Sequence, residues 1–167
     1  MKSLPGILII GIVLGLASNA MAVPIFFAVP MSGLDEVPGP GDPDGTGTAF
    51  LSIDPDALTV EWSIITENID LPITGAHIHQ APVGVAGPIV VDFDGQLSGL
   101  GLTDPDLAGV LAKPESYNVN VHNEPYPEGA IRGQLAAAPT PVIPAPTALG
   151  LAVFGLMSLR WLRRKPV

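Results

Sequence analysis

The sequence predicts an all-β domain, an antiparallel Greek-key β-sandwich, flanked by an N-terminal signal helix and a C-terminal hydrophobic helix. Apolar and polar residues alternate with period two in several short runs rich in β-branched residues, a pattern typical of half-buried strands. Clusters of Gly, Pro and Asp separate these runs and favour turns. The 19 Gly and 19 Pro among 167 residues oppose long helices, because both residue types interrupt helix interiors.

Residues 1–22 have the three parts of a secretory signal peptide. Lys2 precedes an apolar run over residues 4–17 that is short for a membrane span, and Ala20 and Ala22 place small residues at the −3 and −1 positions of a cleavage site. We expect signal peptidase to cut after Ala22, so that the protein is exported. An uncleaved N-terminal anchor is the alternative.

The last 31 residues contain a linker and a second apolar segment. Residues 137–146 are rich in Pro and form a stiff, extended linker. Residues 147–159 are apolar and uncharged, which predicts a membrane-inserted helix. A basic cluster follows, formed by Arg160, Arg163, Arg164 and Lys165. Such a cluster stays on the cytoplasmic side of a membrane, so a plain tail anchor is one interpretation of residues 147–167.

A resemblance gives the other interpretation of this end. Pro144, Ala145 and Pro146, the apolar helix and the basic cluster resemble the PEP-CTERM sorting signal of Gram-negative bacteria that make exopolysaccharide. The resemblance implies recognition by an exosortase-like processing enzyme, a membrane-anchored intermediate and delivery to the cell surface or extracellular matrix. Ala145 departs from the family, which usually has Glu between the two prolines.

Residues 23–136 are enough for one compact domain. The strand pattern occupies residues 49–53, 60–64, 89–93 and 117–122. Turn sequences separate these runs at residues 41–45, 54–56, 84–88 and 104–106. Only residues 106–111 favour a short helix, with Asp106 as its N-cap.

Charge and composition exclude some functions for this domain. All 16 acidic residues lie between Asp35 and Glu128, and only two basic residues, Lys113 and Arg132, lie in the same central part, which gives it a net charge of −14. Such a charge opposes nucleic-acid binding. The absence of Cys excludes disulfides, thiolate metal sites and a cysteine nucleophile.

An ordered set of short motifs identifies a family resemblance. The motifs occupy residues 32–38, 45–49, 58–62, 75–79, 84–91, 117–122 and 129–135. In this order and spacing they closely resemble the CHRD domain, first recognised in chordin and found in many bacterial secreted proteins. The resemblance implies an immunoglobulin-like or superoxide-dismutase-like β-sandwich and no general catalytic activity. Ala130 departs from the family, which commonly has Glu before Ile-Arg-Gly.

All three histidines of the chain lie in two of these motifs. His77 and His79 are two apart on a strand and therefore project from one face, and Asn118, Asn120 and His122 share a face by the same parity. If the two strands are neighbours, the imidazoles converge. One interpretation is structural, because each ring can hydrogen-bond through both nitrogens. The alternative is a Zn or Cu site.

Carboxylates offer two further possibilities for a metal. Asp92 or Asp94 could complete a histidine site. Asp-x-Asp pairs occur at 42/44, 54/56, 92/94 and 104/106, and oxygen ligands of this kind suit Ca²⁺. Three of the four pairs are Asp-Pro-Asp, a good turn sequence.

These patterns lead to three hypotheses. The first is an exported, non-enzymatic CHRD-domain protein, a structural or interaction module that contacts exopolysaccharide or an envelope protein and needs no cofactor. The second is a metal-binding domain or metalloenzyme that uses His77, His79 and His122. The third is an acidic, Ca²⁺-responsive matrix component. We expect Arg132 to make a structural ion pair or to donate to turn carbonyls. Binding of a substrate anion is the alternative, which the net charge of −14 opposes.

Overall fold

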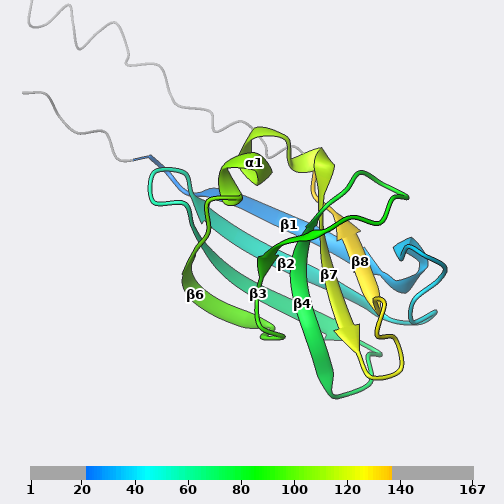
Figure 1. Ribbon diagram of the computed structural model, residues 1–167. Coiled ribbons are helices and arrows are strands. Elements are labelled where there is room, and N and C mark those ends of the chain that lie inside the picture. Colours follow the sequence, from blue (N-terminus) through cyan, green and yellow to red (C-terminus); the bar gives the residue numbers. More distant parts are fainter. Residues whose placement is uncertain (1–21, 137–167) are drawn as a thin grey trace, which may run out of the picture. The chain divides into compact units, whose positions relative to one another are not determined.

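The structure is a computed structural model that describes residues 22–136 (Figure 1). The strands are β1 (Ile25–Ser32), β2 (Thr46–Asp54), β3 (Thr59–Glu67), β4 (Ile73–Gln80), β5 (Ile89–Asp92), β6 (Ser98–Thr103), β7 (Tyr117–Asn123) and β8 (Ile131–Gln134). The helices are the 3₁₀ turns η1 (Gly33–Asp35) and η2 (Pro114–Ser116) and the α-helix α1 (Leu107–Ala112). The prediction of an all-β antiparallel domain is confirmed.

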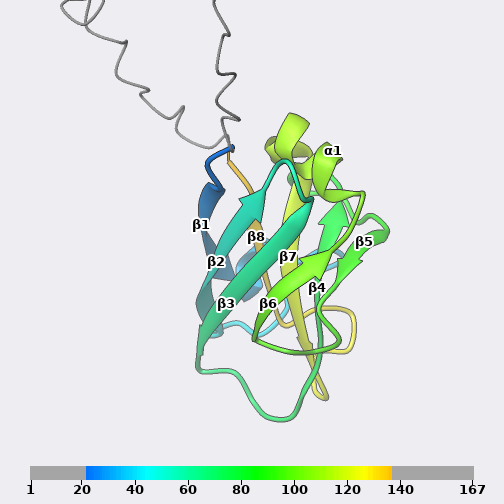
Figure 2. The ribbon, with the colours of Figure 1, turned by 90° about the vertical axis from the view of Figure 1, so that its left-hand side faces the viewer.

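The eight strands form one strongly curled, half-barrel sheet in the order β5-β4-β7-β8-β1-β2-β3-β6. The sequence predicted a sandwich of two separate sheets. The structure has a single sheet instead, because β1 pairs with β8 and so connects the two halves. These strands pair in register only at Ser32 and Arg132. Pro30 has no N–H and contributes no donor to either neighbour of β1. The structure therefore consists of two four-stranded halves that are joined by a short bridge, and Figure 2 shows them facing each other.

The hydrophobic core fills the space between the halves. One half contributes alternate residues of its strands, such as Val29, Leu51 and Val60, and the other contributes Ile78 and Val119, all at most 2% exposed. At the open edge, the Trp62 ring on β3 stacks on Phe93, which follows β5, with ring centroids 4.5 Å apart. Burial of these apolar side chains is the main force that holds the two halves together.

The four strand runs predicted from alternation correspond to β2, β3, β5 and β7, and β4 contains the predicted histidine strand. Alternation alone did not identify β1 and β6, since Pro30 and two glycines weaken the pattern there. The predicted short helix is α1, but Asp106 makes no side-chain cap hydrogen bond. Its own backbone N–H instead donates to Asp104 Oδ1 at 2.9 Å.

Several predictions concern residues outside 22–136. They are the apolar part of the signal peptide with Ala20, the sorting motif at Pro144, Ala145 and Pro146, and the C-terminal apolar segment with its basic cluster. No helix within residues 22–136 is long and apolar enough to cross a membrane.

Candidate metal centre

The three histidines lie on adjacent strands and on the same face of the sheet. β4 and β7 pair antiparallel, with Gly75 opposite His122, His77 opposite Asn120 and His79 opposite Asn118. Because side chains alternate between faces along a strand, this register places all three imidazoles on one side. One ring nitrogen from each histidine lies within 4.8 Å of the other two. The convergence predicted from parity is thus confirmed.

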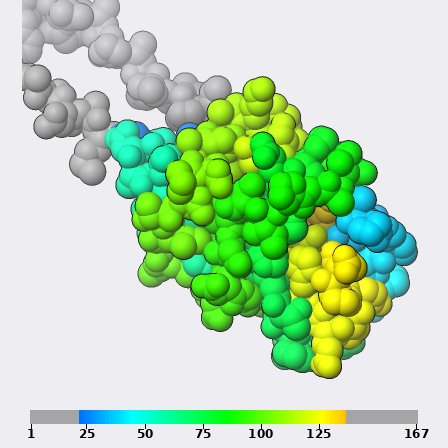
Figure 3. Space-filling model, in the orientation of Figure 1, coloured from blue at the N-terminus to red at the C-terminus, as the bar shows by residue number. Residues whose placement is uncertain are grey.

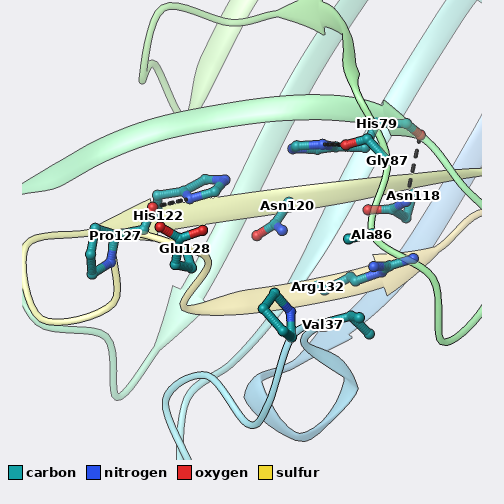
Figure 4. A pocket seen from close by; sticks show the side chains of 11 residues that line it. Val37, His79, Ala86, Gly87, Asn118, Asn120, His122, Pro127, Glu128 and Arg132 are labelled. Atoms are coloured by element: carbon teal, nitrogen blue, oxygen red, sulfur yellow. Dashed lines mark hydrogen bonds between the residues drawn. The ribbon is translucent and has the colours of Figure 1, made fainter.

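Loops cover this polar face, which faces away from the apolar core. Figure 4 shows Ala86 and Gly87 of the β4–β5 loop over His79, and Pro127 and Glu128 of the β7–β8 loop beside His122. In the space-filling view of Figure 3, segments that are far apart in the sequence meet on the surface (blue, green and yellow). The histidines are consequently half-buried rather than exposed.

Backbone carbonyls orient two of the three rings. His79 Nδ1 lies 2.9 Å from Gly87 O, and His122 Nδ1 lies 2.9 Å from Pro127 O. A carbonyl oxygen can only accept, so each Nδ1 carries the proton and donates it. Each Nε2 is then left with a lone pair, and both Nε2 atoms are buried without a hydrogen-bond partner in the described part of the chain.

A carboxylate orients the third ring in the opposite sense. His77 Nε2 lies 3.5 Å from Asp92 Oδ1, the residue directly opposite on β5. A proton on Nε2 faces this carboxylate and leaves the lone pair on Nδ1. That Nδ1 is buried and has no partner among residues 22–136. Asp92 thus positions a ring rather than joining the cluster, and Asp94 is not among the converging groups.

Burial favours the neutral form of His77 and His79. Desolvation, followed by the nearby charge of His122, lowers the pKa of His77 below the usual 6.5. Burial is also the main cause that lowers the pKa of His79, although its hydrogen bond to Gly87 acts in the other direction. Neutral imidazole is the form that binds metal ions.

Gly75 leaves room for the cluster. A Cβ atom at this position would lie 2.6 Å from Cε1 of His77 and 3.5 Å from Cδ2 of His122. Any side chain at Gly75 would therefore push the His77 ring out of its place.

The arrangement fits a tetrahedral Zn²⁺ or a copper ion. Three nitrogen ligands at about 2.0–2.1 Å from an ion lie roughly 3.4 Å from one another, which is inside the 4.8 Å limit found for the three nitrogens. In metal sites, ligating histidines commonly donate their second N–H to a carbonyl or carboxylate, and all three rings face such an acceptor here.

A small pocket opens beside the cluster. It has a volume of about 180 Å³ and is lined by His79 and His122, by Asn118, Asn120 and Arg132, by Glu128, and by Val37, Pro38, Ala86, Gly87 and Pro127 (Figure 4). Both asparagines are at least nine-tenths buried. The site therefore combines a nitrogen cluster with an adjacent polar cavity.

The comparison with family models decides the classification. The CHRD domain model matches residues 27–135. The chain belongs to the CHRD domain family. The resemblance drawn from the ordered motifs is confirmed over nearly the predicted range. No curated protein and no solved structure matches this CHRD protein.

A buried carboxyl group in the CHRD domain was not identified from the sequence. Glu36, just after η1, is 7% exposed, and its Oε2 accepts hydrogen bonds from Asn120 Nδ2 at 3.1 Å and Val37 N at 3.3 Å. Burial raises its pKa to about 7. Gly129 packs against the carboxyl group so closely that a Cβ there would lie 2.4 Å from Oε2. The contact with Asn120 spans 84 residues, so no local pattern could indicate it.

Arg132 has the structural role expected for it. The residue is 4% exposed, and its Nη2 donates to Pro82 O at 3.0 Å. This bond fixes the start of the β4–β5 loop over the polar face.

The Asp-x-Asp pairs serve turns in the CHRD domain. Asp54 Oδ1 accepts from the backbone N–H groups of Asp56 and Ala57 at 2.8 and 2.9 Å, and Asp92 Oδ1 accepts from Asp94 N at 2.8 Å. The same contact links Asp104 and Asp106. Within residues 22–136, no group of three carboxylates is close enough to hold an ion, so these contacts favour the turn interpretation over a Ca²⁺ site.

Proposed function

We propose that this CHRD domain binds one Zn²⁺ or copper ion through His77 Nδ1, His79 Nε2 and His122 Nε2, without being an enzyme. Two observations carry the proposal: one ring nitrogen from each histidine lies within 4.8 Å of the other two, and each ring has a buried nitrogen without a hydrogen-bond partner in the described chain. The opposite nitrogen of each ring faces a fixed acceptor. A metal ion supplies the missing partner for all three atoms at once.

A purely structural role explains this arrangement less well. A structural histidine can use both ring nitrogens in hydrogen bonds, whereas here each ring has one nitrogen that is buried without a partner in the described chain. An unsatisfied buried polar atom costs about 1–3 kcal/mol. Three such atoms within one cluster amount to a large cost in a domain whose total stability is of the order of 5–15 kcal/mol.

Metal analysis of the untagged, full-length protein tests the proposal. We expect near-stoichiometric Zn or Cu after purification in mild detergent, and a loss of at least 100-fold in affinity for His77→Ala. Asp92→Asn should weaken binding by about 10- to 100-fold, because it removes only the group that orients His77. Ser63→Ala, on the exposed outer face of β3, is the control. A folded wild-type protein that fails to bind either metal contradicts the proposal.

For the cellular setting, we propose export followed by sorting at the C-terminus. The support is the signal-peptide pattern that ends at Ala22, and the motif of Pro144, Ala145 and Pro146 before the basic cluster. Mass spectrometry of the protein from an exosortase-containing Gram-negative host tests both. We expect an N-terminus at Val23 and a C-terminus shortened near Pro144, and Ala145→Glu should increase processing. Retention of residues 147–167 in both variants would identify a plain tail anchor.

One surface favours a second candidate function, an interaction module. Phe26, Phe50 and Ile65 lie on the outer face of β1, β2 and β3 and are 66%, 45% and 56% exposed. Exposed aromatic rings on a sheet provide stacking surfaces for sugars or apolar side chains. We propose exopolysaccharide or an envelope protein as the partner. Co-sedimentation with exopolysaccharide should be lost in Phe50→Ser, and unchanged binding would exclude this face.

A further inference from the structure

We infer that the metal keeps an open fourth coordination position that faces the 180 Å³ pocket and takes small neutral ligands that coordinate while donating an N–H or O–H bond. This inference rests on the proposed metal site and adds the class of ligand that the site accepts. It stands on the ligand count, the pocket and two buried amide oxygens.

The ligand count leaves one position free. All three nitrogens come from β4 and β7 and project from one face of the sheet. No carboxylate of residues 22–136 joins the three nitrogens within the 4.8 Å cluster. His79 and His122 line the pocket, whereas His77 does not. We therefore place the free side of an ion held by the three rings toward the pocket, which His79 and His122 line (Figure 4).

Two amide oxygens show what the pocket requires. Asn118 Oδ1 and Asn120 Oδ1 are buried and have no hydrogen-bond partner in the described residues. The orientation of each amide is fixed by its nitrogen. Asn118 Nδ2 donates to Ala81 O at 3.4 Å, and Asn120 Nδ2 donates to Glu36 Oε2. An amide that turned over would lose these bonds, so each oxygen remains a buried acceptor without a partner among the described residues, on a side chain that lines the pocket.

The charges around the pocket disfavour anions. Glu128 lines it, and the central part of the chain carries a net charge of −14. Among the lining residues Arg132 is the one Lys or Arg, and its Nη2 donates to Pro82 O. A ligand with an N–H or O–H group satisfies the asparagine oxygens. An anion such as azide is attracted by the ion's own charge but places further lone pairs against these acceptors and Glu128. Neutral ligands with a donor should bind preferentially.

The visible spectrum of the Co²⁺-loaded full-length protein provides the test, because it reports ligand exchange at the metal. Imidazole coordinates through one nitrogen and donates N–H from the other, N-methylimidazole coordinates but has no donor, and azide is an anion. We expect imidazole to bind at least tenfold more tightly than the other two, which corresponds to about 1.4 kcal/mol. In Asn120→Ala, the ratio of the affinities for imidazole and N-methylimidazole should fall toward one. In Ser63→Ala, this ratio should not change. Metal content after each titration confirms that cobalt stays bound.

The outcomes separate this inference from the proposed function. If Co²⁺ fails to bind, both are wrong. If Co²⁺ binds and no probe changes the spectrum, the site is closed, and only the inference is wrong. Equal affinities for imidazole and N-methylimidazole, or tighter binding of azide, also overturn it. The comparison of the three probes needs only the wild-type protein, so it remains decisive if Asn120→Ala does not fold.

Discussion

The two halves of the sheet use the same strand pairing but bury their residues differently. Along β1 and β2, buried and exposed residues alternate, with one face on the core and the other in water. Along β7, six of the seven residues are buried and the remaining one, His122, is half-buried. Antiparallel sheets commonly leave one face solvated. In β7 the core covers one face, and loop residues such as Gly87 and Pro127 lie over the second, polar face that carries the proposed site.

The largest expected effect tests the apolar face that both halves share. Ile78 on β4 is fully buried, whereas Phe50 on the outer face of β2 is 45% exposed. Ile78→Ala should lower the free energy of unfolding by about 2–5 kcal/mol, since it leaves a cavity. Phe50→Ala should lower it by less than about 1 kcal/mol. Urea denaturation measures both, and similar losses would contradict the contrast between the faces.

The next effect concerns the carboxyl group buried beside β7. The pKa of Glu36 is about 7 in the folded protein and 4.5 without burial, so the folded state holds the proton more tightly. Below pH 4.5 Glu36 is protonated in both states, and its full contribution to the free energy of unfolding is present. This contribution is lost as the pH rises through about 7. The shift corresponds to roughly 3 kcal/mol. Glu36→Gln should therefore gain up to this amount over wild type at pH 8 and little at pH 4.5.

Thermal unfolding of the two proteins from pH 4 to pH 8 measures this difference. The comparison isolates Glu36, because all other titrating groups are common to both proteins. A difference in stability between wild type and variant that does not change with pH would show that folding does not raise the pKa of Glu36.

A smaller change in stability but a clear change in binding is expected at Gly75. In Gly75→Ala, the new methyl group pushes against Cε1 of His77, a ring that can shift at the edge of the cluster. Stability should change by less than about 1 kcal/mol, whereas affinity for Zn²⁺ should fall tenfold or more because the three nitrogens no longer converge. Calorimetric titration with Zn²⁺ measures this, and unchanged affinity would argue against His77 as a ligand.

The smallest effect is expected on the solvated face of the other half. Phe26 is 66% exposed on β1, so Phe26→Ser should change the free energy of unfolding by no more than about 0.5 kcal/mol and leave Zn²⁺ affinity unchanged. Thermal unfolding and a Zn²⁺ titration test this. A larger loss of stability would show that this face is covered by another part of the protein.

Local pattern was enough to predict much of the fold and the histidine cluster. Alternation placed His77 and His79 on one face because side-chain parity is a property of a single strand. Pairing of β4 with β7, the carbonyls of Gly87 and Pro127, and the carboxyl group of Glu36 depend on contacts between distant segments. Such contacts leave no periodic signal. The sequence predicted two sheets for the same reason. The pairing of Ser32 with Arg132 joins the first strand to the last, and a contact between such distant segments leaves no local pattern.

The bridge between β1 and β8 also affects how the domain assembles. The first strand of the domain lies beside the last, so the two halves of the sheet cannot be joined until residues 131–134 have been synthesised. Until then β1 and β7 each present an open edge, with N–H and C=O groups free to pair with another chain. A chain that stops before Ile131 would be expected to aggregate rather than fold, and delayed closure would suit a protein that must remain extended while it crosses a membrane.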